Sequence, residues 1–108
     1  MKICGCVMAK NEELLLPECL NSLKQLTDII IVVNNGSSDN TEKVAEEFGC
    51  ILIDSPDTIV DEGRNEYINM ANALGADWIF ILDADERITS ADAKLMRQAC
   101  ENAAMDVY

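Results

Sequence analysis

Short apolar runs alternate with stretches of helical periodicity along this chain. Four apolar runs, most of them rich in β-branched residues, predict strands at residues 3–8, 29–33, 50–53 and 78–82. Between and after these runs, apolar residues recur every three or four positions and predict helices over about residues 12–26, 40–48, 62–74 and 90–103. This alternation indicates an α/β protein, a three-layer sandwich with helices on both faces of a mostly parallel sheet.

Several residues indicate where the predicted helices begin and end. Asn11 is the expected N-cap of the first helix, and Thr89 or Ser90 is the expected cap of the last. Gly49 and Gly75 are expected to end the second and third helices. The apolar positions expected to face the core are Leu14, Leu15, Cys19, Leu20, Leu23, Leu26, Ile68, Ala71, Leu74, Leu95, Met96 and Ala99.

The order of the strands determines which loops meet. If the first three strands follow one another and the fourth returns to the other side of the first, the order is 3-2-1-4. The loops after strands one and four then diverge at a switch point, where open α/β sheets bind their ligands. This order would place residues 9–11 beside Asp83 and Asp85, with Asn34 and Asn35 one strand away.

Charge and composition narrow the possible partners. The 108 residues are 49% hydrophobic, as expected for one globular domain, but the formal net charge is −12. Nucleic acids and anionic membranes bind through Lys and Arg, so neither is expected as a partner. The longest apolar run is too short to span a bilayer. Five scattered cysteines without any His argue against a zinc site and indicate reduced core thiols in a cytoplasmic protein.

The most informative stretch runs from Trp78 to Glu86. The apolar run Trp78–Leu82 favours a strand buried on both faces, and it ends in Asp83-Ala84-Asp85-Glu86. Two carboxylates at the carboxyl end of a strand offer the oxygen ligands that Mg²⁺ and Mn²⁺ prefer. The alternative is an acidic turn that caps the next helix and binds no metal.

Four segments resemble the family 2 glycosyltransferases of the GT-A fold, in particular the branch of lipopolysaccharide-core sugar transferases. Residues 8–13 resemble the exit of the family's first strand. The segment IIVVNNGSSDNT at residues 30–41 is similar to the family's IIVVDDGSSDGT, and residues 62–65 resemble the start of its third helix. The LDADER segment at residues 82–87 resembles the family's acidic motif. Together these segments cover nearly the whole chain.

The resemblance implies a Rossmann-like GT-A fold and transfer of a sugar, with inversion, from a nucleotide-diphosphate donor. Asp85 would ligate Mg²⁺ or Mn²⁺, and Asp83 would lie near the donor ribose or a second-sphere water. Arg64 would meet the pyrophosphate, although without the family it would be an ordinary surface residue paired with Glu62 or Glu66. Ala9 and Asn11 would line the nucleoside.

The chain also departs from the family pattern. Asn34-Asn35 stand where the family usually has a carboxylate that contacts the base or ribose, so this segment could also be a simple turn. No catalytic base is visible, and Asp106-Val107-Tyr108 resembles the start of a fifth strand. Residues 1–108 are therefore expected to be the nucleotide-sugar-binding half of a transferase domain, inactive in transfer alone. The acceptor (a glycan, a lipid-linked sugar or a protein) stays open.

One alternative function and one prediction about assembly complete the interpretation of the sequence. The chain could be a non-catalytic nucleotide-binding or protein-interaction module derived from such a domain. In the order 3-2-1-4 the fourth strand lies at an edge of the sheet, and an exposed apolar edge favours pairing with another chain. A homodimer joined through residues 78–82 is therefore expected.

Overall fold

The computed structural model describes residues 1–55 and 60–105, and the predicted fifth strand at residues 106–108 lies outside them. The predicted order of elements is confirmed, with boundaries that differ by a few residues. The elements are β1 (Ile3–Ala9), α1 (Leu16–Lys24), β2 (Ile29–Asn34), α2 (Thr41–Glu47), β3 (Ile51–Asp54), α3 (Val60–Ala73), β4 (Trp78–Ile81) and α4 (Ser90–Met105).

The four strands form one sheet in the predicted order β3-β2-β1-β4. All three neighbouring pairs are parallel. The chain therefore adds strands in one direction from β1 to β3 and then places β4 on the opposite side of β1. The switch point lies between β1 and β4, as the sequence predicted.

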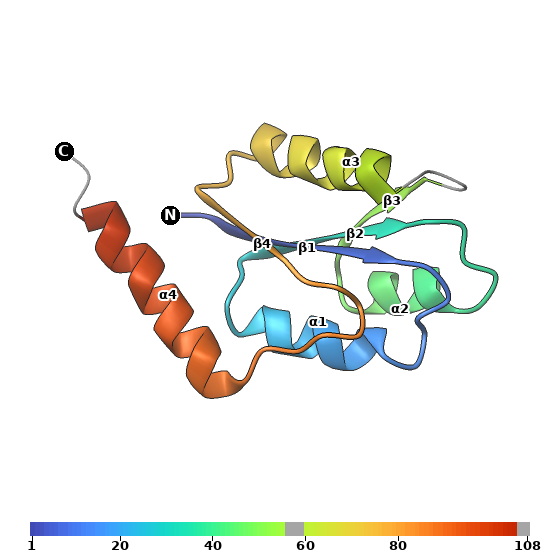
Figure 1. Ribbon diagram of the computed structural model, residues 1–108, viewed down its shortest axis with the longest axis horizontal. Coiled ribbons are helices and arrows are strands. Elements are labelled where there is room, and N and C mark those ends of the chain that lie inside the picture. Colours follow the sequence, from blue (N-terminus) through green and yellow to red (C-terminus); the bar gives the residue numbers. More distant parts are fainter. Residues whose placement is uncertain (56–59, 106–108) are drawn as a thin grey trace.

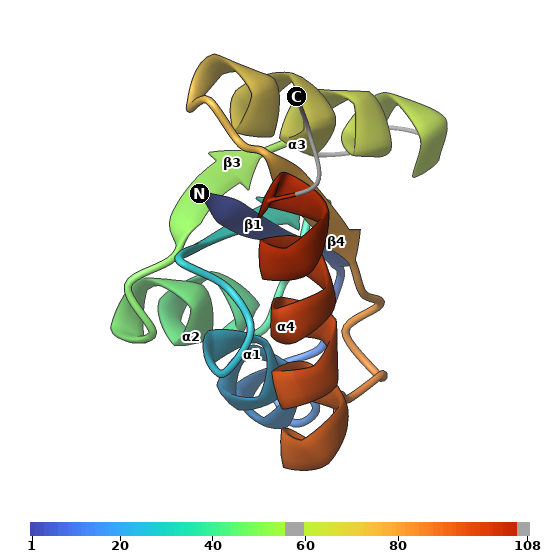
Figure 2. The ribbon, with the colours of Figure 1, turned by 90° about the vertical axis from the view of Figure 1, so that its left-hand side faces the viewer.

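Helices cover both faces of the sheet (Figure 1). Helices α1 and α2 lie on one face and α3 on the other, whereas α4 crosses the end of the sheet where the strands begin (Figure 2). The alternating residues of β2 show why three layers form. Ile30 and Val32 pack with α1 on one face, and Ile31 and Val33 pack with Tyr67 of α3 on the other.

The start of α1 corrects two predictions. Asn11 does not cap this helix, which begins at Leu16 with Pro17 in its first turn. Asn11 has a φ of 54°, a left-handed conformation that Asn tolerates better than most residues. Leu14 and Leu15 are not core residues, because they are 87% and 39% exposed in the loop before the helix.

The burial predicted for β4 is also wrong. Trp78 is 37% exposed and Ile81 is 50% exposed, because β4 lies at an edge of the sheet. A run of apolar residues on an edge strand can leave part of its surface uncovered even when one neighbouring strand is present.

Helix α4 begins as predicted, because the Thr89 hydroxyl accepts a hydrogen bond from the Asp92 amide at 3.1 Å. Its buried face is different from the one expected. Leu95 is 63% exposed and Ala99 is also exposed, whereas Ala93 and Cys100 are buried with Ile3 and Leu26. Met96 packs against this cluster, as predicted.

All five cysteines are free thiols, as predicted, and four of them are buried. Burial raises the pKa of Cys6 and of Cys19 to about 12. Within residues 1–55 and 60–105, no helix is both long and apolar enough to cross a membrane.

Candidate functional site

The loops at the carboxyl ends of the strands bring together most of the residues singled out above. Ala9 of β1 pairs in register with Asn34 of β2, and Asn34 pairs with Asp54 of β3. On the other side of β1, the Leu82 amide donates to the Cys6 carbonyl at 3.0 Å. Asp83 therefore follows directly at the same edge of the sheet.

The loops after β1 and β2 are hydrogen-bonded to each other. The Asn11 amide donates to Ser37 Oγ at 2.9 Å, and Asn11 Oδ1 accepts from the Ser38 amide at 2.7 Å. The Asn35 amide donates to the Ala9 carbonyl at 2.9 Å. These bonds hold Asn11 in its left-handed conformation beside the polar loop that follows β2.

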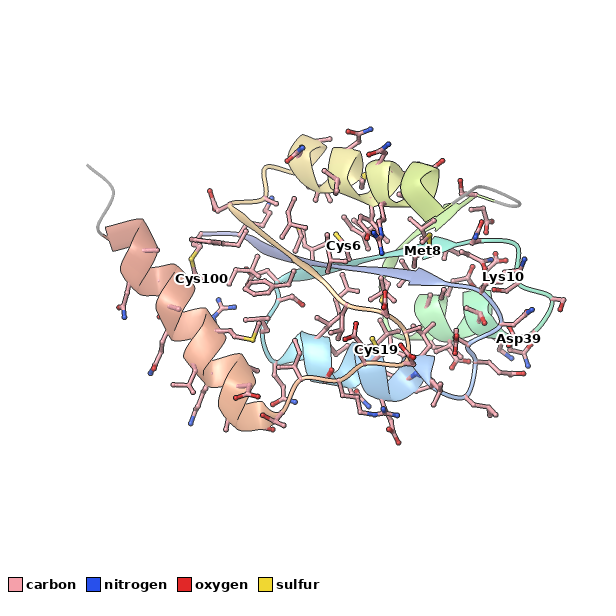
Figure 3. All side chains as sticks on the ribbon, viewed as in Figure 1. Cys6, Met8, Lys10, Cys19, Asp39 and Cys100 are labelled. Atoms are coloured by element: carbon pink, nitrogen blue, oxygen red, sulfur yellow. The ribbon has the colours of Figure 1, made fainter. Side chains whose placement is uncertain are left out.

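Asp39 and Thr41 extend this connection toward α1. Asp39 Oδ2 accepts from the Glu13 amide at 3.3 Å, and Asp39 Oδ1 accepts from the Thr41 amide at 3.0 Å. The Thr41 hydroxyl donates to Asp39 and accepts from the Glu12 amide at 2.9 Å. These hydrogen bonds, that of the Thr41 hydroxyl above all, lower the pKa of Asp39, so its carboxylate is ionised at neutral pH. Figure 3 shows Asp39 and Lys10 at this end of the molecule.

The buried amide of Asn34 is engaged on both sides. Asn34 is 4% exposed. Its Nδ2 donates to Asp54 Oδ1 at 3.0 Å, and its Oδ1 accepts from the Ser37 amide at 3.2 Å. An Asn suits this place because it can donate to a carboxylate and accept from a backbone amide at once. The structure thus places Asn34 beneath the loop, as part of its support.

The acidic segment after β4 is a closed turn. The Glu86 amide donates to the Asp83 carbonyl at 2.9 Å, and Glu86 Oε1 accepts from the Asp83 amide, also at 2.9 Å. Asp83 and Asp85 are both exposed at this turn, whereas Ala84 between them is 5% exposed and packs into the core. The turn therefore presents the two carboxylates to solvent and anchors itself through Ala84.

Helix α1 also supports this turn. The Cys19 thiol lies 3.5 Å from the Asp83 carbonyl, and Figure 3 shows Cys19 beneath the segment that follows β4. Arg87, just after the turn, forms an ion pair with Glu18 of α1. Both side chains are exposed, so the pair contributes little to stability.

Helix α3 reaches the same edge from the other face. Tyr67 is 1% exposed and packs with Cys6. Burial raises the pKa of Tyr67; the charge of Arg64, which hydrogen-bonds the tyrosine side chain, lowers it, and the Asp83 carboxylate raises it. Arg64 and Asp83 therefore both act on one buried hydroxyl, although they lie far apart in the sequence.

The acidic turn offers a cation two carboxylate ligands, Asp83 and Asp85. In the described part of the chain, no group of three His, Cys, Asp or Glu residues is placed to hold a metal ion. Mg²⁺ commonly takes one or two protein carboxylates and completes its shell with phosphate oxygens and water. Two exposed carboxylates on one turn, Asp83 and Asp85, fit a cation that is shared with a phosphorylated ligand.

The structure thus gathers Ala9, Asn11, Asn34 and Asn35 on one side of the switch point. It places Asp83 and Asp85 on the other side, and the charges of Arg64 and Asp83 both act on the hydroxyl of Tyr67. The sequence did not identify Asp39, Thr41, Tyr67 or the turn-closing role of Glu86. A local signal was present only for the bond between Asp39 and Thr41, since an Asp side chain often accepts from the backbone amide two residues on.

Comparison with known proteins identifies the family. The family model for glycosyl transferase family 2 matches residues 5–108. A TPR repeat-containing protein of Synechococcus elongatus is 42% identical over 85 residues, which cover 77% of this chain and 20% of that protein. An uncharacterised glycosyltransferase of Rickettsia typhi is 33% identical over 88 residues, covering 82% of this chain and 29% of the relative. The chain thus spans less than a third of either relative.

Solved structures match the fold. A crystal structure of S. aureus TarS residues 1–349 in complex with UDP has a TM-score of 0.69 at 24% identity, with 96% of this chain and 31% of that chain covered. Glucosyl-3-phosphoglycerate synthase from Mycobacterium tuberculosis, in complex with Mn²⁺, UDP and glucosyl-3-phosphoglycerate, has a TM-score of 0.60 at 22% identity. That match covers 77% of this chain and 33% of the synthase. The family model, which matches nearly the whole chain, shows that this chain belongs to glycosyl transferase family 2.

Proposed function

We propose that residues 1–108 form the nucleotide-sugar-binding part of an inverting, metal-dependent glycosyltransferase. The observation that carries this proposal is the acidic turn Asp83–Glu86, which lies at the switch point beside the exit of β1. Membership of the family supports sugar transfer from an activated donor. The ligands in the two matched crystal structures, UDP in one and UDP with Mn²⁺ in the other, support a nucleoside diphosphate and a divalent cation here.

The positions of the residues support the role that we propose for each. Ala9 and Asn11 would line the nucleoside, because the first has a small side chain and the second is held at the rim. Asn35, the residue after β2, would face the base or ribose, and Asn34 would support it from beneath. Arg64 in the second turn of α3 would bind the pyrophosphate, since a guanidinium donates several hydrogen bonds to phosphate oxygens.

Asp85 and Asp83 would hold Mg²⁺ or Mn²⁺ together with the donor phosphates. A bound divalent cation stabilises negative charge that develops on a leaving phosphate. The net charge of −12 increases the need for a bound cation, because an acidic domain repels an anionic donor unless positive charge is supplied locally.

Calorimetry with UDP and with GDP, each with and without Mn²⁺, tests the proposal. We expect binding that depends on Mn²⁺ and is lost in EDTA or after Asp85→Ala. Asp92→Asn, which removes one acidic charge from the exposed start of α4, is the matched control and should leave binding unchanged. Equal binding in EDTA, or an unchanged affinity for Asp85→Ala, would contradict the metal role.

Two further parts of the proposal concern the chain by itself. In the described residues, the late acidic side chain nearest the site is Glu86, and it is already bonded to the Asp83 amide. We therefore expect donor binding without transfer to an acceptor. The alternative, an interaction module, is favoured by the exposed Trp78 and Ile81 of β4, which we propose as the contact of a homodimer.

A further inference from the structure

The carboxylate of Asp39 bonds to two different loops, one through each oxygen. Oδ1 accepts from the amide and hydroxyl of Thr41, within its own loop and at the start of α2. Oδ2 accepts from the Glu13 amide, 26 residues earlier in the loop after β1. A carboxylate can serve both sides at once because it accepts on both oxygens.

We propose that Asp39 is a positioning residue that joins the β1–α1 loop to the β2–α2 loop and so fixes Asn11 at the rim of the donor site. This inference rests on the proposed function for its ligand. The joint itself, meaning the hydrogen bonds of Asp39 and Thr41 that connect the two loops, is a property of the fold. Asp39 touches neither the reacting atoms nor the acidic turn in this scheme. It acts through the backbone of residues 11–13.

Neighbouring bonds support the same joint. The Glu12 amide donates to Thr41 Oγ1, whose own proton goes to Asp39, so two consecutive amides of the first loop depend on this carboxylate. Asn11 completes the joint through Ser37 and Ser38. Asn11 has a φ of 54°, and such a conformation persists only where its surroundings hold it.

The effect of substituting Asp39 would differ if this residue only capped α2 and did not connect the two loops. An N-cap needs one oxygen, and Asn is as good a cap as Asp. In Asp39→Asn the remaining oxygen can serve Thr41 or Glu13 but not both, because the new amide group donates and cannot accept. Asp39→Asn should therefore preserve α2 and separate the two loops.

Asp28 offers a matched control at the opposite end of the sheet. Its Oδ2 accepts from the Ile3 amide at 2.9 Å, and its Oδ1 accepts from Arg97 of α4 at 3.4 Å. Asp28→Asn makes the same chemical change in a carboxylate that also bonds two elements. It lies at the end where the strands begin, away from the candidate donor site.

The experiment compares wild-type, Asp39→Asn and Asp28→Asn chains by calorimetry with UDP and Mn²⁺ and by amide hydrogen exchange. We expect Asp39→Asn to weaken UDP binding about tenfold, in line with the loss of one charge-assisted hydrogen bond. Exchange should accelerate at residues 11–13 and stay slow in β2. Asp28→Asn should leave UDP affinity within about twofold of wild type, since its bonds serve only the other end of the sheet.

Several outcomes would overturn the inference. Unchanged exchange at the Glu13 amide in Asp39→Asn would show that the joint does not hold that loop. Faster exchange with unchanged UDP affinity, or an equal loss in Asp28→Asn, would show a merely structural role. If Asp39→Asn fails to fold, Thr41→Val instead removes the hydroxyl that links Asp39 to the Glu12 amide; about threefold weaker binding is then expected, and an unchanged affinity overturns the proposal.

Failure of the proposed function would look different. A wild-type chain that binds neither UDP nor GDP in Mn²⁺ would contradict the donor site itself. The joint would then be judged by exchange alone: faster exchange confined to residues 11–13 in Asp39→Asn supports it, and unchanged exchange there overturns it.

Discussion

Two isoleucines lie beside the same residue in this sheet and have opposite environments. Cys6 of β1 pairs in register with Ile31 of β2 on one side and with Ile81 of β4 on the other. Ile31 is fully buried, whereas Ile81 is 50% exposed. Both come from apolar runs that predict a strand. The comparison shows that the composition of a run predicts a strand, while the neighbours on both sides and both faces determine its burial.

The largest expected effect is the difference in stability between alanine substitutions at these two positions. Ile31→Ala should lower the free energy of unfolding by about 2–5 kcal/mol, because it leaves a cavity between the sheet and α3. Ile81→Ala should cost less than about 1 kcal/mol, since half of its surface is already in water. Denaturant unfolding followed by circular dichroism measures both.

Equal losses at the two positions would contradict the comparison. They would show that Ile81 is covered in solution, either by another copy of the chain or by another segment. Measuring Ile81→Ala at low and high protein concentration separates these causes, because only a second copy makes the loss depend on concentration.

The next effect concerns assembly through the edge of β4. The exposed backbone of an edge strand and the apolar surface of Trp78 and Ile81 favour pairing with a second copy. The net charge of −12 opposes association but is screened beyond about 8 Å at physiological salt. We expect light scattering to give twice the monomer mass, with tighter association as the salt concentration rises.

Two lysine substitutions test where such a dimer forms. Ile81→Lys should give a monomer, because a charged side chain on an edge strand opposes pairing. Leu95→Lys adds the same charge at an apolar residue that is 63% exposed on α4, outside the edge, and should leave the dimer intact. A wild-type monomer at high protein and salt concentrations would contradict the prediction.

Much of the fold could be predicted because the sequence patterns that indicate strands, helices and helix ends are local. The Ile29–Val33 run and the stops at Gly49 and Gly75 predict elements that the structure contains. The order 3-2-1-4 was expected only on the condition that the fourth strand returns beside the first, and the sheet confirms it. The acidic segment after the fourth strand and the polar loops after the first two were expected at one edge, and the register places them there.

The predictions that were wrong share a physical cause: each depends on contacts between residues that are far apart in the sequence. Asn11 was predicted to cap the first helix, but its Oδ1 accepts a hydrogen bond from the Ser38 amide in the other loop. Leu95 and Ala99 fit a helical stripe, but α4 presents Ala93 and Cys100 to Ile3 and Leu26 instead. The bond between Asp39 and the Glu13 amide and the environment of Tyr67 likewise depend on tertiary structure, and no spacing in the sequence indicates them.

A smaller effect on UDP binding is expected from substitutions of Glu86. These substitutions distinguish a residue that closes the turn from one that binds the cation, as Asp83 and Asp85 are proposed to do. Glu86 Oε1 accepts from the Asp83 amide, a bond that needs an acceptor but no charge. Glu86→Ala should therefore weaken Mn²⁺-dependent UDP binding about tenfold by loosening the turn, whereas Glu86→Gln should stay within about twofold of wild type. Calorimetry measures both.

The conservative variant decides between two roles for this residue. If Glu86→Gln binds UDP as weakly as Glu86→Ala, the charge of Glu86 matters, and the residue belongs with Asp83 and Asp85 in binding the cation. Full affinity in both variants would show that the turn keeps its shape without this bond.

The smallest expected effect is a change in the rate at which the Cys6 thiol of β1 is labelled, compared with the Cys50 thiol. Burial raises the pKa of Cys50 to about 11 and that of Cys6 to about 12, so at pH 8 both thiols are almost entirely protonated and react slowly. Cys50 is half-buried and should be labelled first by a disulfide reagent. These raised values also mean that the thiols favour the folded state below about pH 9 and lose that contribution as the pH rises through 11 to 12.

Cys6 then tests the comparison of Ile31 with Ile81 without unfolding the protein. Ile81→Ala should speed labelling of Cys6 a few-fold relative to Cys50, because loosening the edge strand uncovers one side of β1 while the core remains folded. Labelling followed by mass spectrometry of peptides measures the ratio within one sample. If Cys6 reacts as slowly in Ile81→Ala as in the wild type, β4 is held at its edge as firmly as β2 is held in the centre, and the difference in exposure between the two isoleucines has no counterpart in local stability.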